Sequence, residues 1–187
     1  MSSLGVKMKK VNKTCFAILG MLFDKSRTGY EIKKFMQEST AHFWQESDAS
    51  IYPMLKKLEA EGKVESQTTR KGKLERVRYT ITQTGKKEFS IWMTKEVEPG
   101  THRDELLLKL FFGANASKEE IIKHLLLRQK KVGELQKKYA YIQMFIFPEV
   151  APDYKHKLFW QMALRNGVIN ADAEFKWIEE CLDMLKK

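Results

Sequence analysis

The sequence predicts a mostly α-helical protein made of two domains, with a single β hairpin in the N-terminal domain. Apolar residues recur at helical spacing through most of the 187 residues. Only residues 64–81 show the alternation of apolar and polar side chains that is typical of half-buried strands. The helical pattern is broken at residues 96–100, which contain a proline and a glycine. We therefore expect one domain over residues 1–98 and an all-helical domain over residues 99–187.

Three helices are predicted ahead of the hairpin. The first covers roughly Asn12–Phe23 and is apolar over one half of its surface, which suits a helix at the centre of a small domain. A turn is expected at residues 24–27. Thr28 then caps a second helix, which runs from Gly29 to about Thr40.

The third predicted helix, Asp48–Gly62, has one inward and one outward face. Asp48 or Ser50 is expected to cap its start, and its final glycine suits the left-handed conformation that ends a helix. The inward face is apolar: Ile51, Met54, Leu55 and Leu58. The outward face is small and basic: Ala49, Pro53, Lys56, Lys57 and Ala60. Small residues let the helix axis approach base edges in a DNA major groove, and lysines bind phosphate oxygens or a guanine edge.

The predicted hairpin carries a concentrated positive charge. Strands at residues 64–68 and 76–81 flank a tight turn that contains Gly72. Four cations lie at or beside this turn: Arg70, Lys71, Lys73 and Arg76. Three helices followed by a basic two-stranded β wing form a winged helix-turn-helix domain. The simpler interpretation, that these cations only keep a surface solvated, is disfavoured by the three helices that precede them.

Composition agrees with a folded protein that binds a polyanion. The chain is 43% hydrophobic and 11% aromatic, and its net charge is +10. Residues 1–100 carry 19 Lys and Arg against 12 Asp and Glu, whereas residues 101–187 carry 15 against 12, so the half with the wing holds most of the positive excess. No apolar run is long enough to span a membrane, and the first ten residues do not form a secretory signal. We interpret Cys15 and Cys181 as reduced core thiols of a cytoplasmic protein.

The tail beyond residue 100 is predicted to be helical throughout. A short apolar helix covers residues 104–113, a long helix runs from Lys118 past Tyr141, and a last helix runs from about Asp153 to Lys186. Ser117 and Glu120 have the spacing of a capping box at the start of the first long helix.

An apolar stripe follows each long helix of the tail. In the first, only Arg128 interrupts the stripe: Ile121, Leu125, Val132, Leu135, Tyr139, Ile142 and Ile146. The stripe of the last helix also contains Gly167, where a partner helix can approach closely: Phe159, Met162, Ile169, Ala173, Trp177, Cys181 and Met184. Because sustained heptad-like stripes indicate interhelical seams, we expect a helical dimerisation domain. Its expected interface comprises Leu125, Val132, Leu135, Tyr139, Ile142, Trp177 and Met184. The alternative is an intramolecular three-helix bundle.

Several short runs carry a resemblance to a known family. They lie at residues 16–22, 28–32, 50–62 and 79–85, and in the tail at residues 106–112 and 164–167, followed by Trp177. The run Ser50-Ile51-Tyr52-Pro53, with Leu-Lys-Lys-Leu-Glu at 55–59, is the specific part. The chain thereby resembles the PadR family of bacterial transcriptional regulators, in the subfamily with a long helical C-terminal domain.

The resemblance implies a function and a set of contacts. It implies a sequence-specific DNA-binding transcriptional regulator, usually a homodimeric repressor on a palindromic operator. By the same resemblance Tyr30, Ser50, Tyr52, Lys56 and the wing cations contact double-stranded DNA. The wing here reads Arg-Lys-Gly-Lys at 70–73, where the family often has Gly-Arg-Pro, so the contact mode of the wing is not implied.

Other classes of function find little support. The four histidines, at positions 42, 102, 124 and 156, lack the spacing of metal ligands, and no glycine-rich phosphate loop is present. We predict no catalytic site, no metal and no cofactor. A winged-helix module that binds an acidic protein remains the alternative. Single-stranded RNA is disfavoured, because no aromatic stacking platform interleaves the basic residues.

A small-molecule effector of unknown identity is also compatible with the sequence. Six aromatic residues could line a pocket between the domains, although each is more simply a core residue: Phe89, Trp92, Phe145, Phe147, Trp160 and Trp177.

Overall fold

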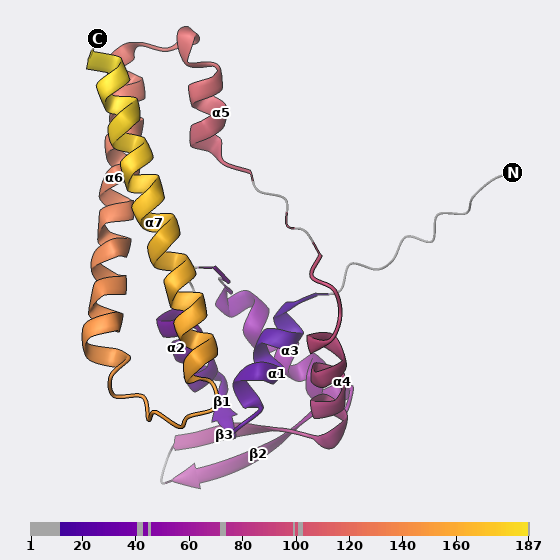
Figure 1. The fold of residues 1–187 in the computed structure, drawn as a ribbon. Coiled ribbons are helices and arrows are strands. Elements are labelled where there is room, and N and C mark those ends of the chain that lie inside the picture. Colours follow the sequence, from indigo (N-terminus) through magenta and orange to yellow (C-terminus); the bar gives the residue numbers. More distant parts are fainter. Residues whose placement is uncertain are drawn as a thin grey trace, which may run out of the picture. The chain divides into compact units, whose positions relative to one another are not determined.

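The structure, a computed structural model, describes residues 12–40, 43–44, 46–71, 74–98, 100 and 103–186. The chain divides into two compact units, residues 1–98 and residues 99–187. Their helices and strands are labelled in Figure 1. Throughout the described ranges, no helix is long and apolar enough to cross a membrane.

The N-terminal unit combines four helices with a small antiparallel sheet. Its helices are α1 (Thr14–Leu22), α2 (Gly29–Ser39), α3 (Asp48–Ala60) and α4 (Gln83–Met93). Its strands are β1 (Arg27–Thr28), β2 (Val64–Lys71) and β3 (Leu74–Ile81), in the order β1-β3-β2. β2 and β3 form the long hairpin seen at the bottom of Figure 1.

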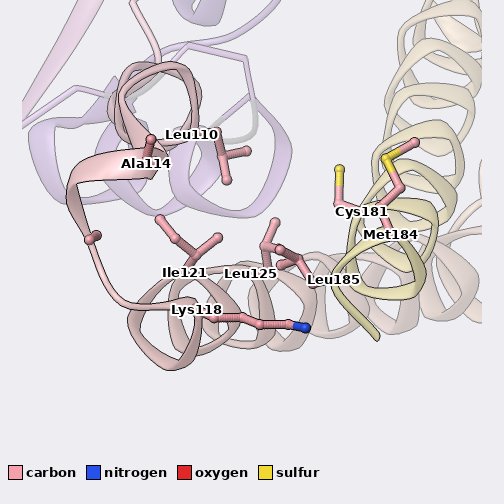
Figure 2. A pocket seen from close by; sticks show the side chains of 10 residues that line it. Leu110, Ala114, Lys118, Ile121, Leu125, Cys181, Met184 and Leu185 are labelled. Atoms are coloured by element: carbon pink, nitrogen blue, oxygen red, sulfur yellow. The ribbon is translucent and has the colours of Figure 1, made fainter. Parts of the chain in front are cut away.

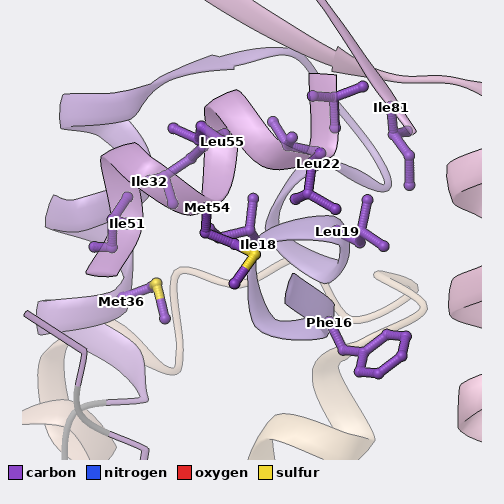
Figure 3. Close-up of a cluster of buried hydrophobic side chains, with 12 residues drawn as sticks. Phe16, Ile18, Leu19, Leu22, Ile32, Met36, Ile51, Met54, Leu55 and Ile81 are labelled. Atoms are coloured by element: carbon purple, nitrogen blue, oxygen red, sulfur yellow. The ribbon is translucent and has the colours of Figure 1, made fainter. Parts of the chain in front are cut away.

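The core of this unit lies around α1. Figure 3 shows Ile18, Leu19 and Leu22 of α1 among the buried side chains of α2, α3 and β3. On α3 the predicted inward residues are all buried: Ile51, Met54, Leu55 and Leu58. This burial fixes which side of α3 faces outward, because the four residues share one helical face.

Two helix ends agree with their sequence signals, and one does not. The Thr28 hydroxyl accepts the Glu31 backbone N–H at 3.1 Å, and the Glu31 carboxylate accepts the Thr28 N–H at 2.7 Å, which completes a capping box at α2. Gly62 has a φ of 66°, as predicted for a residue that follows a helix. The N-cap of α3, however, is Ser47 and not Asp48 or Ser50.

The sheet is larger than the predicted hairpin. Residues 24–27 were expected to form a turn, but Arg27 pairs with Tyr79 and Thr28 with Arg78, which adds β1 as a third strand. A strand of two residues has no alternation for sequence reasoning to detect. The hairpin strands also extend further toward their connection, so Arg70 and Lys71 lie in β2.

The C-terminal unit is helical, as predicted. α5 (Glu105–Phe111) and the 3-10 turn η1 (Gly113–Asn115) precede α6 (Lys118–Tyr141), which ends in the π-helical turn η2 (Ile142–Ile146). α7 covers Lys157–Lys186 and therefore starts later than the predicted Asp153. The Ser117 and Glu120 capping box at the start of α6 is confirmed.

α6 and α7 pack along their length, as Figure 1 shows. The buried seam consists of Ile121, Leu125, Val132 and Tyr139 of α6 with Ala171 and Ile178 of α7. A Cβ on Gly167 would lie 2.5 Å from the Tyr139 hydroxyl oxygen, so the tyrosine ring occupies the space above this glycine. The close approach predicted at Gly167 is therefore made by α6 of the same chain.

The stripe predicted for the last helix packs only in part on the α6–α7 cluster: Trp177 and Cys181 contact it, whereas Phe159, Met162 and Ile169 are exposed. Most of the apolar residues of α7 in this cluster follow a second stripe: Leu164, Val168, Ala171, Phe175, Ile178, Leu182 and Leu185. α7 is apolar on two faces. Periodicity alone does not tell which of the two faces the neighbouring helix covers.

Arg128, which interrupts the stripe of α6, is held by two carboxylates. Its Nε donates to Glu174 of α7 at 2.6 Å, and its Nη2 donates to Asp104 at 3.1 Å. Asp104 also caps α5 by accepting the backbone N–H groups of Leu106 and Leu107. This polar interruption thus fastens both α5 and α7 to α6.

Candidate nucleic-acid interface

The outward face of α3 is exposed along its length. Ala49, Pro53, Lys56 and Ala60 are all exposed, as expected for a surface free to meet a ligand. Lys57 is exposed too, with its Nζ 3.8 Å from the Glu61 carboxylate. No ion pair involves Lys56 among the described residues, so its ammonium group is available to an external anion.

Two tyrosines extend this face toward the start of α2. The Tyr52 side chain is 45% exposed, and its ring lies directly over Gly29, where a Cβ would come within 2.6 Å of Cε1. Tyr30, the second residue of α2, is 65% exposed. The absence of a side chain at Gly29 therefore sets how closely the ring of Tyr52 approaches α2.

Ser50 has a structural role that the sequence did not reveal. Its hydroxyl lies 2.7 Å from both Glu46 Oε2 and the carbonyl oxygen of Ser47. Glu46 Oε1 in turn accepts hydrogen bonds from the Thr14 hydroxyl at 2.6 Å and the Trp44 indole N–H at 2.9 Å. Glu46 thus joins α1, the loop after α2 and the start of α3, and it was missed because its partners are far apart in sequence.

The wing presents its cations from the hairpin. Arg76 is exposed on β3, opposite Thr69. Arg70 and Lys71 have backbone positions in β2, while Lys73 lies outside the described residues. Of the four predicted wing cations, the structure therefore describes the side chain of Arg76 alone.

A further arginine of the hairpin, Arg78, is a positioning residue. Its Nη2 donates to Glu31 at 3.1 Å and its Nη1 donates to the Ser26 carbonyl oxygen at 2.8 Å. Glu31 is the capping-box residue of α2, and the N–H of Thr28 holds the pKa of its carboxyl below the usual value, with a further contribution from Arg78. The contact links the wing strand β3 to the helix that carries Tyr30.

The residues predicted for a dimer interface have several environments within one chain. Leu125, Val132 and Tyr139 are buried in the α6–α7 seam. Leu135, Ile142 and Trp177 are half-buried against the same cluster, and Met184 is 71% exposed. Contacts of these residues with a second copy stay a prediction.

Large apolar side chains remain uncovered on the C-terminal unit. They occur on α5, on α6, on the π-helical turn and on α7; those at least half exposed are Leu108, Phe111, Phe112, Leu127, Tyr141, Met144, Phe145, Leu158, Phe159, Met162, Ile169 and Met184. Exposed apolar area of this extent marks an interaction surface rather than ordinary solvent-facing surface.

Two clefts are formed by described residues of the C-terminal unit. The larger, of about 550 Å³, is mainly apolar and lies between α5, the start of α6 and the end of α7, where Figure 2 shows Leu110, Ile121, Leu125 and Met184 around it. Burial raises the pKa of the Cys181 thiol on its wall. The smaller cleft, of about 420 Å³, is polar and lies where α5 meets α6. Within the described part of the chain, no group of His, Cys, Asp and Glu residues is placed to hold a metal ion.

Comparison with known proteins places the chain in a family. Residues 18–91 match the transcriptional regulator PadR-like family, and residues 102–186 match the C-terminal region called virulence activator alpha. The negative transcriptional regulator PadR of Bacillus subtilis is 35% identical over 183 residues, which cover 92% of this chain and 97% of that protein.

Solved structures of the same relative agree with the fold. Bacillus subtilis PadR in complex with operator DNA has a TM-score of 0.76 at 32% identity, covering 93% of this chain and 99% of that chain. The same regulator in complex with p-coumaric acid has a TM-score of 0.73 at 26% identity, covering 94% and 100%. The winged-helix unit with a helical C-terminal unit is thus confirmed, and the chain belongs to the PadR-like family of transcriptional regulators.

Proposed function

We propose that the chain is a DNA-binding repressor that acts as a homodimer on a palindromic operator in the cytoplasm. The observation that carries the proposal is the exposed, basic outward face of α3, on a chain 32% identical to a regulator whose structure contains operator DNA. In this proposal α3 enters the major groove and the β2–β3 hairpin follows the adjacent backbone.

The side chains on this face suit the two kinds of contact that such an interface needs. Lys56, without an acidic partner among the described residues, binds a phosphate or a guanine edge. Pro53 and Ala60 are exposed and compact, so the helix axis can come close to the bases. Glu46 and Ser50 support the contact indirectly by holding the start of α3.

The uncovered apolar area of the C-terminal unit supports the homodimer. A twofold interface uses the same patch on both copies, so an apolar patch on one chain is complementary to itself. Two winged helices joined in this way match a palindrome, because the symmetry of the operator then mirrors that of the protein.

A small-molecule effector is part of the proposal. The Bacillus subtilis relative is known in a complex with p-coumaric acid, and the present chain has two clefts in its C-terminal unit. Binding of an effector regulates transcription only if its affinity differs between the DNA-bound and free states.

Selection of bound genomic fragments, followed by a titration of the recovered operator, tests the proposal. We expect Lys56→Ala to weaken specific binding by about 1–3 kcal/mol while the fold is retained. Lys87→Ala is the matched control, since Lys87 is an exposed cation of α4 in the same unit. The assignment of α3 to the groove is wrong if Lys56→Ala binds the operator as well as Lys87→Ala does.

A further inference from the structure

The polar cleft of the C-terminal unit has the composition of an anion site. It lies where the start of α5 meets the middle of α6 and has a volume of about 420 Å³, within the range of small-ligand sites. Four of its lining residues are permanent cations and two are acids. The cations are Arg103, Lys109, Arg128 and Lys131, and the acids are Asp104 and Glu105.

Ion pairs inside the cleft account for both acids. Asp104 is 3.1 Å from Arg128, and Glu105 is 2.9 Å from Lys109. The contact with Lys109 lowers the pKa of Glu105, and the charge of His124 adds to this effect, so this acid stays ionised near neutral pH. Glu174, outside the lining, also pairs with Arg128 at 2.6 Å. Arg103 and Lys131 form no ion pair with any described residue, so they are the two lining cations without an acidic partner.

We propose that this cleft binds a small organic dianion, either a phosphate monoester or a dicarboxylate. Two uncompensated cations attract a dianion more strongly than a monoanion, and a cleft with low-dielectric walls focuses their field. Leu106 and Leu127 supply apolar wall, which accommodates a short carbon skeleton between the charged groups. His124 adds a ring nitrogen as a further hydrogen-bonding group.

The position of the cleft gives the ligand a route to regulation, and this part rests on the proposed DNA-binding function. Arg103 and Asp104 lie within six residues of the boundary between the units, and Asp104 caps α5. The guanidinium of Arg128 is shared between Asp104 and Glu174. A dianion beside Arg128 competes with Asp104 for this guanidinium, and it thereby changes how the chain enters α5.

Calorimetric titration of the full chain at pH 7.5 without DNA tests the site directly. The probes are phenyl phosphate, succinate and the monoanion p-coumarate. We expect phenyl phosphate or succinate to bind more tightly than p-coumarate and to bind more weakly as salt is raised. The tighter of the two dianions identifies the source of the charge as phosphate or dicarboxylate.

Variants locate the binding event. Arg103→Ala with Lys131→Ala should weaken dianion binding by at least about tenfold, because each change removes a charge-assisted contact. Lys131→Arg should retain binding, and Lys137→Ala, which alters an exposed cation further along α6, should have no effect. The proposal is overturned if neither dianion binds, if p-coumarate binds more tightly than both, or if the double variant binds a dianion like the unchanged chain.

The operator titration keeps this result separate from the proposed function. The Arg103→Ala, Lys131→Ala variant should bind operator DNA normally without ligand and should lose the effect of the dianion on that binding. If the unchanged chain binds no operator, the proposed DNA-binding function is refuted. If the double variant binds the dianion normally, the placement of the ligand in this cleft is refuted. If the double variant loses only the effect of the dianion and still binds the operator, the result supports this cleft as the dianion site.

Discussion

At the scale of single residues, the ring of Tyr52 depends on a glycine in another helix. A Cβ at position 29 would lie 2.6 Å from Tyr52 Cε1, closer than two carbon atoms can approach without displacement. The ring is partly exposed and therefore has space to move away. The expected consequence of Gly29→Ala is a rotated Tyr52 on a folded domain.

We predict that Gly29→Ala weakens operator binding by about tenfold, or ~1.4 kcal/mol. A double-mutant cycle with Tyr52→Ala checks the cause, since Gly29→Ala should add little once the ring is gone. Fluorescence anisotropy with labelled operator gives the four affinities. Equal losses from Gly29→Ala with and without the Tyr52 ring would show that the glycine acts by some other contact.

Side-chain roles were predictable where they depend on exposure and not where they depend on distant partners. The exposure of Lys56 could be predicted from helical periodicity, because Lys56 lies opposite the buried Ile51 and Leu58 on the same helix. The linking role of Glu46 could not be predicted in this way, since its hydrogen-bond donors Thr14 and Ser50 come from different helices. No spacing rule in the sequence relates residues that only the folded core brings together.

At the scale of elements, the start of α2 connects stability with pH. The capping box of Thr28 and Glu31 holds the first turn, and the backbone N–H of Thr28 lowers the pKa of the Glu31 carboxyl. A carboxyl whose pKa is lower in the folded protein than in the unfolded chain stabilises the fold at every pH above the unfolded pKa, which is 4.5 for Glu. This stabilisation is lost as the pH falls through the lower pKa of the folded protein.

We predict that Thr28→Ala lowers the free energy of unfolding by ~1 kcal/mol at pH 7. The unchanged protein should lose stability between about pH 5 and pH 3, the range in which carboxyl groups titrate. Glu31→Gln should lose less stability over this range, because it has no carboxyl at position 31 to protonate. Urea denaturation at several pH values measures both effects. Parallel pH profiles for Glu31→Gln and the unchanged chain would contradict the assigned role of the carboxylate.

The wing gives a separate prediction at this scale. Replacement of Lys71 and Lys73 by Ala should weaken binding to all DNA sequences alike. The slope of log affinity against log salt should fall by about 0.9 for each phosphate contact that is lost. Titrations on operator and on unrelated DNA at several salt concentrations provide the slopes. An unchanged slope with reduced sequence preference would show instead that the wing reads bases or groove shape.

Elements were predicted well when they repeat a pattern over several turns. The long helices α6 and α7 and the hairpin fall in this class. β1 has two residues and no pattern. α7 is apolar on two faces, since Met162 and Ile169 are as apolar as Leu164 and Val168, so periodicity did not indicate which face α6 covers. Burial is settled by what the neighbouring helix covers, and local sequence does not contain that information.

At the scale of the whole molecule, we expect the exposed apolar stripe of α7 to form contacts between the two copies of the proposed dimer. The side chains of Phe159, Met162 and Ile169 are exposed in the single chain. Val132 is buried in the seam between α6 and α7, so a charge there would disrupt the unit itself. A test of dimerisation therefore belongs on the exposed stripe, where a charge leaves the fold of the chain intact.

We predict that Met162→Asp with Ile169→Asp yields a folded monomer. Joining two winged helices makes the second half-site contact intramolecular, so loss of the dimer should weaken binding to an inverted repeat by roughly 10²–10⁴. Binding to a single half-site should be unaffected. The best repeats should place the half-sites about a whole number of ~10–10.5 bp turns apart, on one face of the duplex.

Analytical ultracentrifugation beside a titration on inverted repeats measures both parts of this prediction. Gln161→Asp with Asn170→Asp is the matched control, because it adds the same charge at exposed polar positions of α7. Circular dichroism should show unchanged helix content in both variants. If the Met162 and Ile169 variant stays dimeric with full affinity, the two copies meet elsewhere. The uncovered aromatic residues at the end of α5, Phe111 and the C-cap residue Phe112, would then be the next surface to charge.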